Sequence, residues 1–157
     1  MPNNSIPAGY HSLTPSIIVR RGEEAVEFYR RAFGATVRQR LDMPDGKIMH
    51  AELEIDGSVF MLSDESPAWK SFAPESVGGT SSALHLYVAD VDAAFARAVE
   101  AGATPTMPPA DMFWGDRAAY LMDPFGHRWG VATRVEEVSE EETQRRAEAF
   151  LKESGAA

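Results

Sequence analysis

The segment RRAFGAT, Arg30 to Thr36, has a counterpart in AVEAGAT, Ala98 to Thr104. Both end in Gly-Ala-Thr, and the offset between them is 68 residues. An amphipathic pattern precedes each glycine and a strand-like pattern follows each threonine, so Gly34 and Gly102 are expected to cap the C-terminal ends of two helices. A repeat of this length indicates that one supersecondary unit has been duplicated, and that each copy buries its apolar face against the other.

Around the first copy, the residue pattern predicts a β-α-β-β-β module over residues 11–63. GEEAVEFYRRAFG carries the 3.6-residue apolar period of a helix. Asp56-Gly57 lies between two strand-like segments and favours a type I′ hairpin turn, because Asp and Gly accept positive φ angles. The expected elements are a strand at 12–19, a helix at 22–34 and strands at 36–43, 47–55 and 58–63.

Around the second copy, the same order of elements is predicted over residues 82–134. Residues 64–81 are rich in Ser, Pro and Gly and are typical of a linker or flap. A C-terminal helix over 139–153 begins with the capping-box pair Ser139 and Glu142. The expected elements of the second module are a strand at 83–88, a helix at 90–102 with Asp90 as its N-cap, and strands at 104–110, 117–122 and 127–133.

Composition excludes several classes of protein. The chain has 157 residues, no cysteine and a formal net charge of −9. The absence of cysteine excludes disulfides and thiolate chemistry, and the acidic balance disfavours nucleic-acid binding, which needs clustered Lys and Arg. No segment has the length and apolarity of a membrane span or the pattern of a signal peptide. A cytoplasmic protein that contacts neither nucleic acid nor membrane is therefore expected.

Three motifs resemble those of one superfamily. AVEFYRRAFGA (25–35), HLYVADVDAAF (85–95) and DPFGHRW (123–129) resemble the vicinal oxygen chelate superfamily, which includes glyoxalase I, extradiol dioxygenases and bleomycin-binding proteins. DGKIMHAELEI, FWGDR and RVEEVSEEE resemble its PhnB-like branch. The resemblance covers residues 11–134. It implies that residues 1–157 form one α+β domain, in which two β-α-β-β-β modules form a cupped mixed sheet. It also implies a homodimer.

The resemblance also locates the positions at which metal-using members hold a divalent cation. In this sequence these positions are Thr14, Met61, Ala83 and Gly130. None of them is His, Asp or Glu, and a hydroxyl with a thioether lacks the imidazole and carboxylate donors of such sites. We therefore expect no metal cofactor at the superfamily's position.

Strand alternation predicts which side chains face the cup. The face that carries Ala83 also carries His85 and Tyr87, while Leu84 and Leu86 face the helices. In the first module, Glu52 is expected beside Met61 and His50 beside Ser63. Met49, Ala51, Leu53 and Ile55 form the predicted helix-facing set, and Thr14, Ser16, Ile18, Arg128 and Ala132 are assigned to the cup.

The predicted ligand-binding residues are His50, Glu52, His85, Tyr87, Trp114 and Arg128. The alternative interpretation of the histidines is that they are polar surface positions satisfied by neighbours or water. A further alternative is a displaced two-His-one-carboxylate metal site made of His50, Glu52 and His85. No catalytic residue is assigned.

Several aromatic residues have two interpretations. FWGDR forms either a structural turn in which Asp116 and Arg117 pair or cap the backbone, or an aromatic wall with Trp114 stacked on a ligand. Trp69 and Phe72 are either buried anchors of a flap or ligand-facing groups. His127 and Trp129 are expected to be packing residues.

Two functions follow from these patterns. The first is a metal-independent small-molecule-binding protein of the glyoxalase/bleomycin-resistance type, whose acidic balance suits a cationic or aromatic guest. The second is a glyoxalase- or dioxygenase-like enzyme, a lyase or oxidoreductase, that uses a relocated metal or a His–Glu acid–base pair.

Overall fold

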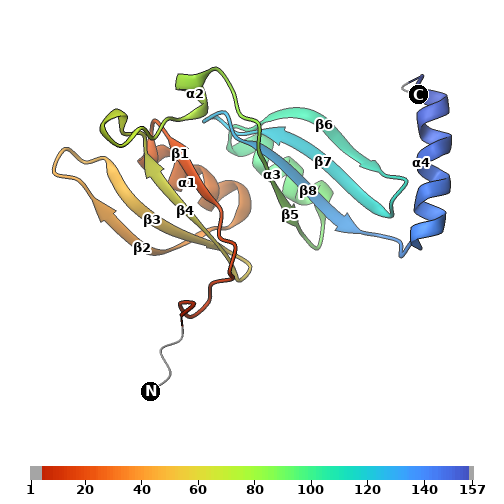
Figure 1. Ribbon diagram of the computed structural model, residues 1–157, viewed down its shortest axis with the longest axis horizontal. Helices are drawn as coiled ribbons and strands as arrows, with labels where there is room; N and C mark the ends of the chain where they lie inside the picture. The colour runs from red at the N-terminus through yellow and green to blue at the C-terminus, as the bar shows by residue number, and fades with distance from the viewer. Residues whose placement is uncertain (1–4, 156–157) are drawn as a thin grey trace.

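A computed structural model describes residues 5–155 and contains two β-α-β-β-β modules, as the repeat predicts (Figure 1). The fold is α+β. The first module consists of β1 (Ser16–Val19), α1 (Gly22–Phe33), β2 (Thr36–Asp42), β3 (Ile48–Ile55) and β4 (Ser58–Asp64). The second consists of β5 (Ala83–Tyr87), α3 (Val91–Ala101), β6 (Thr104–Asp111), β7 (Asp116–Met122) and β8 (Arg128–Arg134).

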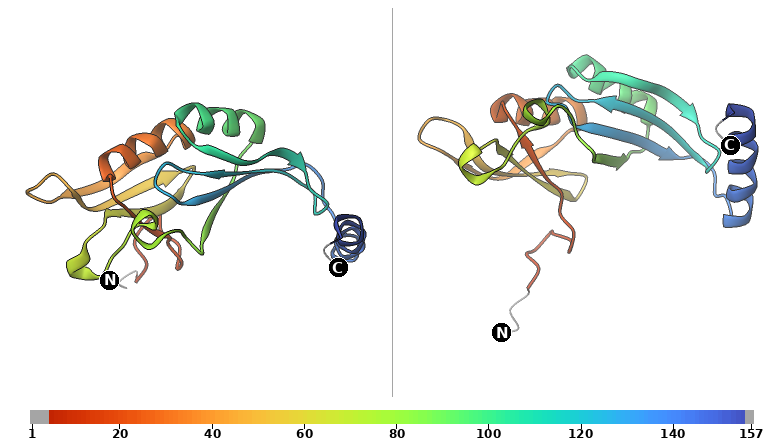
Figure 2. Two further views of the ribbon diagram at one scale, coloured as in Figure 1. Left: turned by 90° about the horizontal axis from the view of Figure 1, so that it is seen from above. Right: turned by 45° about the horizontal axis from the view of Figure 1, so that its top comes forward.

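Each module forms its own four-stranded mixed sheet. The strand orders are β1-β4-β3-β2 and β5-β8-β7-β6, with the first strand of each module parallel to its last. Within residues 5–155, no strand ladder joins the two sheets. The left view of Figure 2 shows α1 and α3 side by side on one face of the sheets, with residues 5–15 and the linker on the opposite face.

An aromatic core joins the two modules where the sheets do not. Tyr29 and Phe33 of α1 are buried, and the Phe33 ring lies 4.6 Å from the ring of Trp129 on β8. Phe60 of β4 and Phe125 of the turn before β8 also contact Tyr29. The two modules therefore share one apolar core, and the expectation that Trp129 is a packing residue is confirmed.

A buried carboxylate completes this junction. Asp123 is 4% exposed and accepts hydrogen bonds from Tyr29 Oη (2.6 Å) and Trp129 Nε1 (3.0 Å). It also accepts from the backbone N–H groups of Phe125 and His127, both at 2.9 Å. Burial and the adjacent Asp123 charge raise the pKa of Tyr29 well above its usual value, so its hydroxyl remains a donor.

Two further contacts cross the module boundary. His127 Nε2 donates to the Ile18 carbonyl oxygen at 2.8 Å, so this histidine anchors the edge strand β1. Arg97 Nε of α3 donates to the Ala32 carbonyl oxygen of α1 at 2.8 Å. The position of His127 agrees with the structural role expected for it.

The turns follow the local chemistry of the sequence. Asp56 and Gly57 have φ angles of 46° and 78°, the two positive values that a type I′ turn requires. Gly34 caps α1 in the left-handed region with φ 69°, and Asp90 caps α3 by accepting a hydrogen bond from Ala93 N–H. Turn and cap residues therefore identified these boundaries correctly.

One predicted boundary is wrong, and one of the two interpretations of the linker aromatics is excluded. β1 starts at Ser16 rather than Ser12, and the linker contains a 3-10 turn (Pro67–Trp69) and the short helix α2 (Pro74–Val77). Trp69 and Phe72 are 59% and 47% exposed, which excludes them as buried anchors.

The predicted helix-facing set of β3 is wrong at one position. Ala51, Leu53 and Ile55 are buried, but Met49 is 40% exposed and Ile48 is buried in its place. The register between β2 and β3 shifts between Leu41 and Asp42, so one residue of β3 is left out of the pairing. Such a β-bulge reverses the alternation of side chains on either side of it.

The helix α4 (Glu140–Ser154) projects from the end of the second module, as Figure 1 shows. Ser139 accepts a hydrogen bond from Glu142 N–H, which confirms the expected N-cap. No residue of α4 is buried, and within residues 5–155 no helix has the length and apolarity needed to cross a membrane.

Candidate ligand-binding site

Four of the predicted site residues, His50, Glu52, His85 and Tyr87, lie on the two sheet faces that α1 and α3 leave uncovered, here called the first and second open faces. Ladder register places Glu52 opposite Met61 on the first face, as alternation predicted. It places Tyr87 opposite Ala132 and His85 opposite Gly130 on the second. Leu84 and Leu86, on the other side of β5, pack against the core.

The centre of the second open face is made of small residues crossed by rings from the edge strand. Gly130 and Ala132 of β8 are paired with Tyr120 and Ala118 of β7. Ala118 and Ala132 are fully buried, whereas Tyr87 is 53% exposed. Because the Tyr87 hydroxyl reaches Asp116 on β7, its ring must cross β8 above these alanines. The small residues thus provide a flat support for aromatic rings.

Gly130 leaves space that the His85 ring occupies. A Cβ built on Gly130 would lie 2.5 Å from His85 Nδ1 and 3.2 Å from Tyr120 Cε1. The position at which the superfamily resemblance calls for a carboxylate therefore has no room for one while His85 keeps this orientation. His85 and Tyr87 are packed edge to face, with ring centroids 5.1 Å apart.

Asp116 fixes the aromatic residues at one end of the second open face. It is 1% exposed, and its Oδ2 accepts from Tyr87 Oη (2.9 Å) and Trp114 Nε1 (3.0 Å) while Oδ1 accepts from Arg134 Nε (2.5 Å). Burial opposes ionisation of this carboxyl, but the three hydrogen bonds outweigh it and hold the pKa of Asp116 below its usual value. Tyr87 and Trp114 are therefore locked in place by one ionised group.

FWGDR forms a turn, as its structural interpretation expects, but Asp116 and Arg117 do not pair with each other. Arg117 pairs instead with Asp92 of α3 and Asp111 of β6, at 2.7 and 3.1 Å. Adjacent residues of a strand point to opposite faces, so Asp116 faces the open side and Arg117 the helix side. Strand geometry thus separates two residues that are neighbours in sequence.

The first open face carries a polar cluster around Glu52. Its carboxylate lies 3.4 Å from His50 Nε2 and is 16% exposed. The N-terminal strap, residues 5–14, lies across this face and forms with it a cavity of about 590 Å³. Tyr10, Thr14, Arg38, Glu52 and Met61 are among the residues that line the cavity.

Tyr10 is the strap residue placed against Glu52. Its ring centroid is 5.4 Å from the Arg38 guanidinium, which also donates to the Ala8 carbonyl oxygen at 3.1 Å. Its hydroxyl is buried and makes no hydrogen bond of ordinary geometry within residues 5–155. Interaction with the Glu52 carboxylate raises the pKa of Tyr10, and interaction with the Tyr10 hydroxyl lowers the pKa of Glu52.

The structure divides the predicted site residues into groups. It brings His50 to Glu52 on the first open face, and His85, Tyr87 and Trp114 together on the second. Within residues 5–155, no hydrogen bond or ring contact connects these two groups. Arg128 belongs to neither, because it lines a groove of about 300 Å³ between β1 and β5 with Leu13 and Ala83.

The donor set does not fit a metal site at the superfamily's position. Thr14 and Met61 both line the strap cavity, and Ala83 and Gly130 lie on the second module. In the part of the chain that the structure describes, no three His, Cys, Asp or Glu side chains are grouped to hold a metal ion. His50, Glu52 and His85, the displaced set considered from the sequence, therefore do not form such a group.

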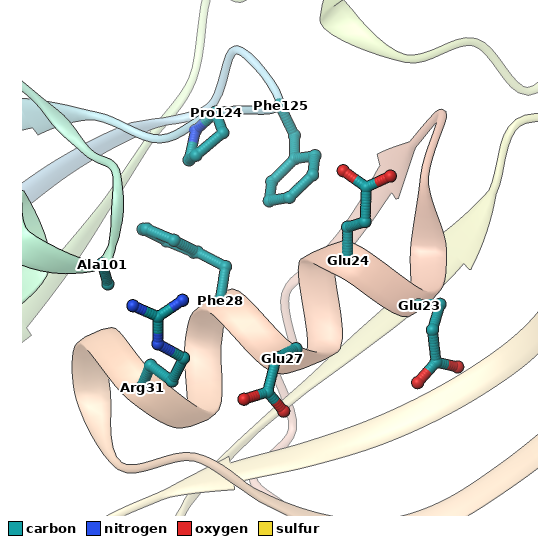
Figure 3. A pocket seen from close by; sticks show the side chains of 8 residues that line it. All are labelled: Glu23, Glu24, Glu27, Phe28, Arg31, Ala101, Pro124 and Phe125. Atoms are coloured by element: carbon teal, nitrogen blue, oxygen red, sulfur yellow. The ribbon is translucent and has the colours of Figure 1, made fainter.

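A second cavity, of about 470 Å³, lies on the helix side between α1 and the turn before β8. Figure 3 shows Glu24 pointing toward Phe125, while Glu23 and Glu27 point away from it. Glu24 pairs with Arg21 at 3.0 Å and Glu27 with Arg30 at 3.5 Å. Because these carboxylates diverge and have cationic partners, this cavity is not a convergent polar site.

Tyr10, Arg38 and Asp116 are site residues that sequence reasoning missed or misassigned. The segment containing Tyr10 has no periodicity that would place it on a sheet. Arg38 lies at a register shift of β2, where alternation does not predict the direction of a side chain. Asp116 lies one residue before the strand predicted at 117–122, so alternation was not applied to it, although it is the first residue of β7.

The matched β-α-β-β-β modules and the open sheet faces define the class of protein. The model of the glyoxalase/bleomycin resistance protein/dioxygenase superfamily matches residues 10–131, and the chain belongs to this superfamily. It is 44% identical over 136 residues to an uncharacterized protein of Mycobacterium tuberculosis, covering 85% of this chain and 80% of that protein.

Solved structures share the fold. The crystal structure of an Arabidopsis thaliana gene product matches with a TM-score of 0.61 and 27% identity, covering 78% of this chain and 98% of that one. A PhnB protein from Bacillus cereus matches with a TM-score of 0.61 and 18% identity, covering 78% of this chain and 99% of that one, and shows the fold alone.

Proposed function

We propose that this protein binds a small molecule without a metal ion, in the cup formed by the open faces of its paired modules. The observation that carries this proposal is the chemistry at the superfamily's metal positions. Thr14, Met61, Ala83 and Gly130 supply neither imidazole nor carboxylate, and the His85 ring fills the space above Gly130.

The ligand contacts proposed for the cup differ between the two faces. The second open face offers the exposed rings of His85 and Tyr87, which pack edge to face, and the buried Asp116 holds Tyr87. The first offers the ionised Glu52 beside His50. Flat aromatic surface with a few polar groups is the usual composition of a small-molecule pocket.

An acid–base enzyme is the second candidate, and the His50–Glu52 contact favours it. A carboxylate 3.4 Å from an imidazole nitrogen can orient the ring for proton transfer. In this proposal His50 exchanges a proton with a bound substrate and Glu52 positions the imidazole.

The test begins with mass spectrometry of small molecules that co-purify with the protein, followed by calorimetry with the molecule identified. His85→Ala and Glu52→Gln should each weaken binding by about 1–3 kcal/mol if a charge-assisted hydrogen bond is lost, with little change in Tm. His127→Ala is the matched control, because His127 bonds to Ile18 away from both polar clusters and should lower Tm without changing affinity.

Metal removal separates the proposed binding protein from a metal-dependent enzyme. Dialysis against EDTA should leave binding and Tm unchanged. About one equivalent of zinc, iron, nickel or manganese per chain, lost together with binding on dialysis, would contradict the proposal. Turnover of the bound molecule that His50→Ala abolishes would favour the acid–base enzyme instead.

A further inference from the structure

The N-terminal strap covers the first open face but is held there by few interactions. Within residues 5–155, the only hydrogen bond that ties residues 5–14 to the rest of the protein runs from Arg38 to the Ala8 carbonyl oxygen. Ile6 and Leu13 are 42% and 86% exposed. A segment with so little buried apolar surface and so few hydrogen bonds opens at low free-energy cost.

Tyr10, at the centre of the strap, occupies the part of the first open face that a ligand would contact. Its ring faces the Arg38 guanidinium, and its hydroxyl lies near enough to Glu52, in the same cavity, to lower the pKa of that carboxyl. Both groups line the same cavity. The Tyr10 side chain thus places an aromatic ring and a hydrogen-bond donor against the first open face.

The fit of Tyr10 is incomplete, because its buried hydroxyl lacks a hydrogen bond of ordinary geometry among the described residues. Burying a hydroxyl without a full hydrogen bond costs free energy that a better placed donor recovers. A free molecule is not tethered to the strap backbone, so it can place a donor to make the full hydrogen bond that the Tyr10 hydroxyl lacks.

We propose that Tyr10 is an internal occupant of the first open face, displaced by an aromatic ligand that carries a hydrogen-bond donor. This inference rests on the proposed binding function. The ligand ring takes the place of the Tyr10 ring on Arg38, and its hydroxyl or amino group donates to Glu52. The chemical class is therefore a phenol or an aromatic amine.

The probe is 4-methylphenol, which reproduces the tyrosine side chain, and 4-methylanisole is the matched compound without a donor. Dissociation constants are measured by NMR titration of the full chain. Tyr10→Ala should bind 4-methylphenol about tenfold tighter than the unmodified protein, as expected if the strap leaves the face open in about a tenth of the molecules.

Three variants show whether the gain comes from Tyr10 itself. Leu13→Ala changes an exposed strap residue and should leave the affinity unchanged. Tyr10→Phe keeps the ring on Arg38 and should still compete with the probe. Adding Glu52→Gln to Tyr10→Ala should weaken 4-methylphenol binding about tenfold and abolish the preference over 4-methylanisole.

Equal affinity of the probe for the unmodified protein and Tyr10→Ala would overturn the inference, as would equal binding of the two probes by Tyr10→Ala. Absence of probe binding to every variant would also overturn it. The proposed function is judged separately, since a co-purifying molecule that binds equally well with and without Tyr10 supports it while excluding a role for the strap.

Discussion

Gly130 shows how one missing side chain changes what a sheet face can hold. With no Cβ at this position, the His85 ring lies over Gly130 of β8, and Tyr120 borders the same space. A side chain at residue 130 and the present orientation of His85 exclude each other. The glycine is thus matched to a particular histidine rather than to a turn.

Gly130→Ala should move the His85 ring without unfolding the protein. The clash falls on the end of an exposed side chain, which can turn away, so the free energy of unfolding should change by less than about 1 kcal/mol. The measurement is the ¹H–¹³C imidazole signal of His85 together with Tm. An unchanged imidazole signal would contradict the packing described, and His85→Ala/Gly130→Ala is the control in which the clash is absent.

Asp116→Asn should destabilise the protein by about 2 kcal/mol at pH 7, because hydrogen bonds to a buried charge are replaced by weaker ones or lost. The pKa of Asp116 is lowered by folding, so its contribution is fully present above the unfolded pKa of about 3.9 and is lost as pH falls through the lower folded value.

The difference in free energy of unfolding between the unmodified protein and Asp116→Asn should therefore shrink as pH is lowered from 7 toward 2.5. It is measured by urea denaturation at each pH. Asp111→Asn is the control, because that carboxylate is exposed on β6 and pairs with Arg117 at the surface. A difference that stays constant down to pH 2.5 would exclude an ionised Asp116 as its source.

The elements of this fold were largely predictable, because local chemistry fixes them. Gly34 and Asp90 mark helix ends through backbone conformation and capping, and alternation assigned His85 and Tyr87 to one face correctly. The remainder depends on contacts between distant segments. A β-bulge turns the Met49 side chain to the face opposite to the one that alternation predicts, and the strap takes its position from contacts with Arg38 and Glu52 on other strands.

The contact between α1 and the turn before β8 should account for a measurable part of the stability. Tyr29→Phe removes the hydroxyl that donates to Asp123 and should cost about 1–2 kcal/mol. In a double-mutant cycle with Trp129→Phe, the two changes should not be additive, since both donors share Asp123 Oδ2. Additive free energies of unfolding from urea titrations would argue against a shared acceptor network.

At the scale of the whole molecule, apolar side chains on the open faces and on α4 are exposed to solvent in the single chain. Phe150 and Leu151 of α4 are 53% and 41% exposed, and Phe150 contacts the chain through the Phe113 ring, 5.5 Å away. A helix with an unpartnered apolar stripe is typical of one that packs against another subunit.

We therefore predict a homodimer in which α4 contacts the partner subunit. Light scattering at micromolar concentration should give about twice the 17.2 kDa mass of the chain. Phe150→Ser/Leu151→Ser should shift the mass toward the monomer with little change in secondary structure, whereas Lys152→Ser should leave it unchanged. A monomer mass for the unmodified protein would refute the prediction.

The division into two sheets without a common ladder has a practical consequence. The modules pack together chiefly through the Tyr29–Asp123 hydrogen bond, the tilted ring contact of Phe33 with Trp129 and the hydrogen bond from His127 to Ile18. The linker, residues 64–81, connects them. Cutting that linker removes no strand pairing between modules. Two separately expressed fragments would then reassemble like the halves of a complementation reporter, with each fragment carrying one of the two open faces.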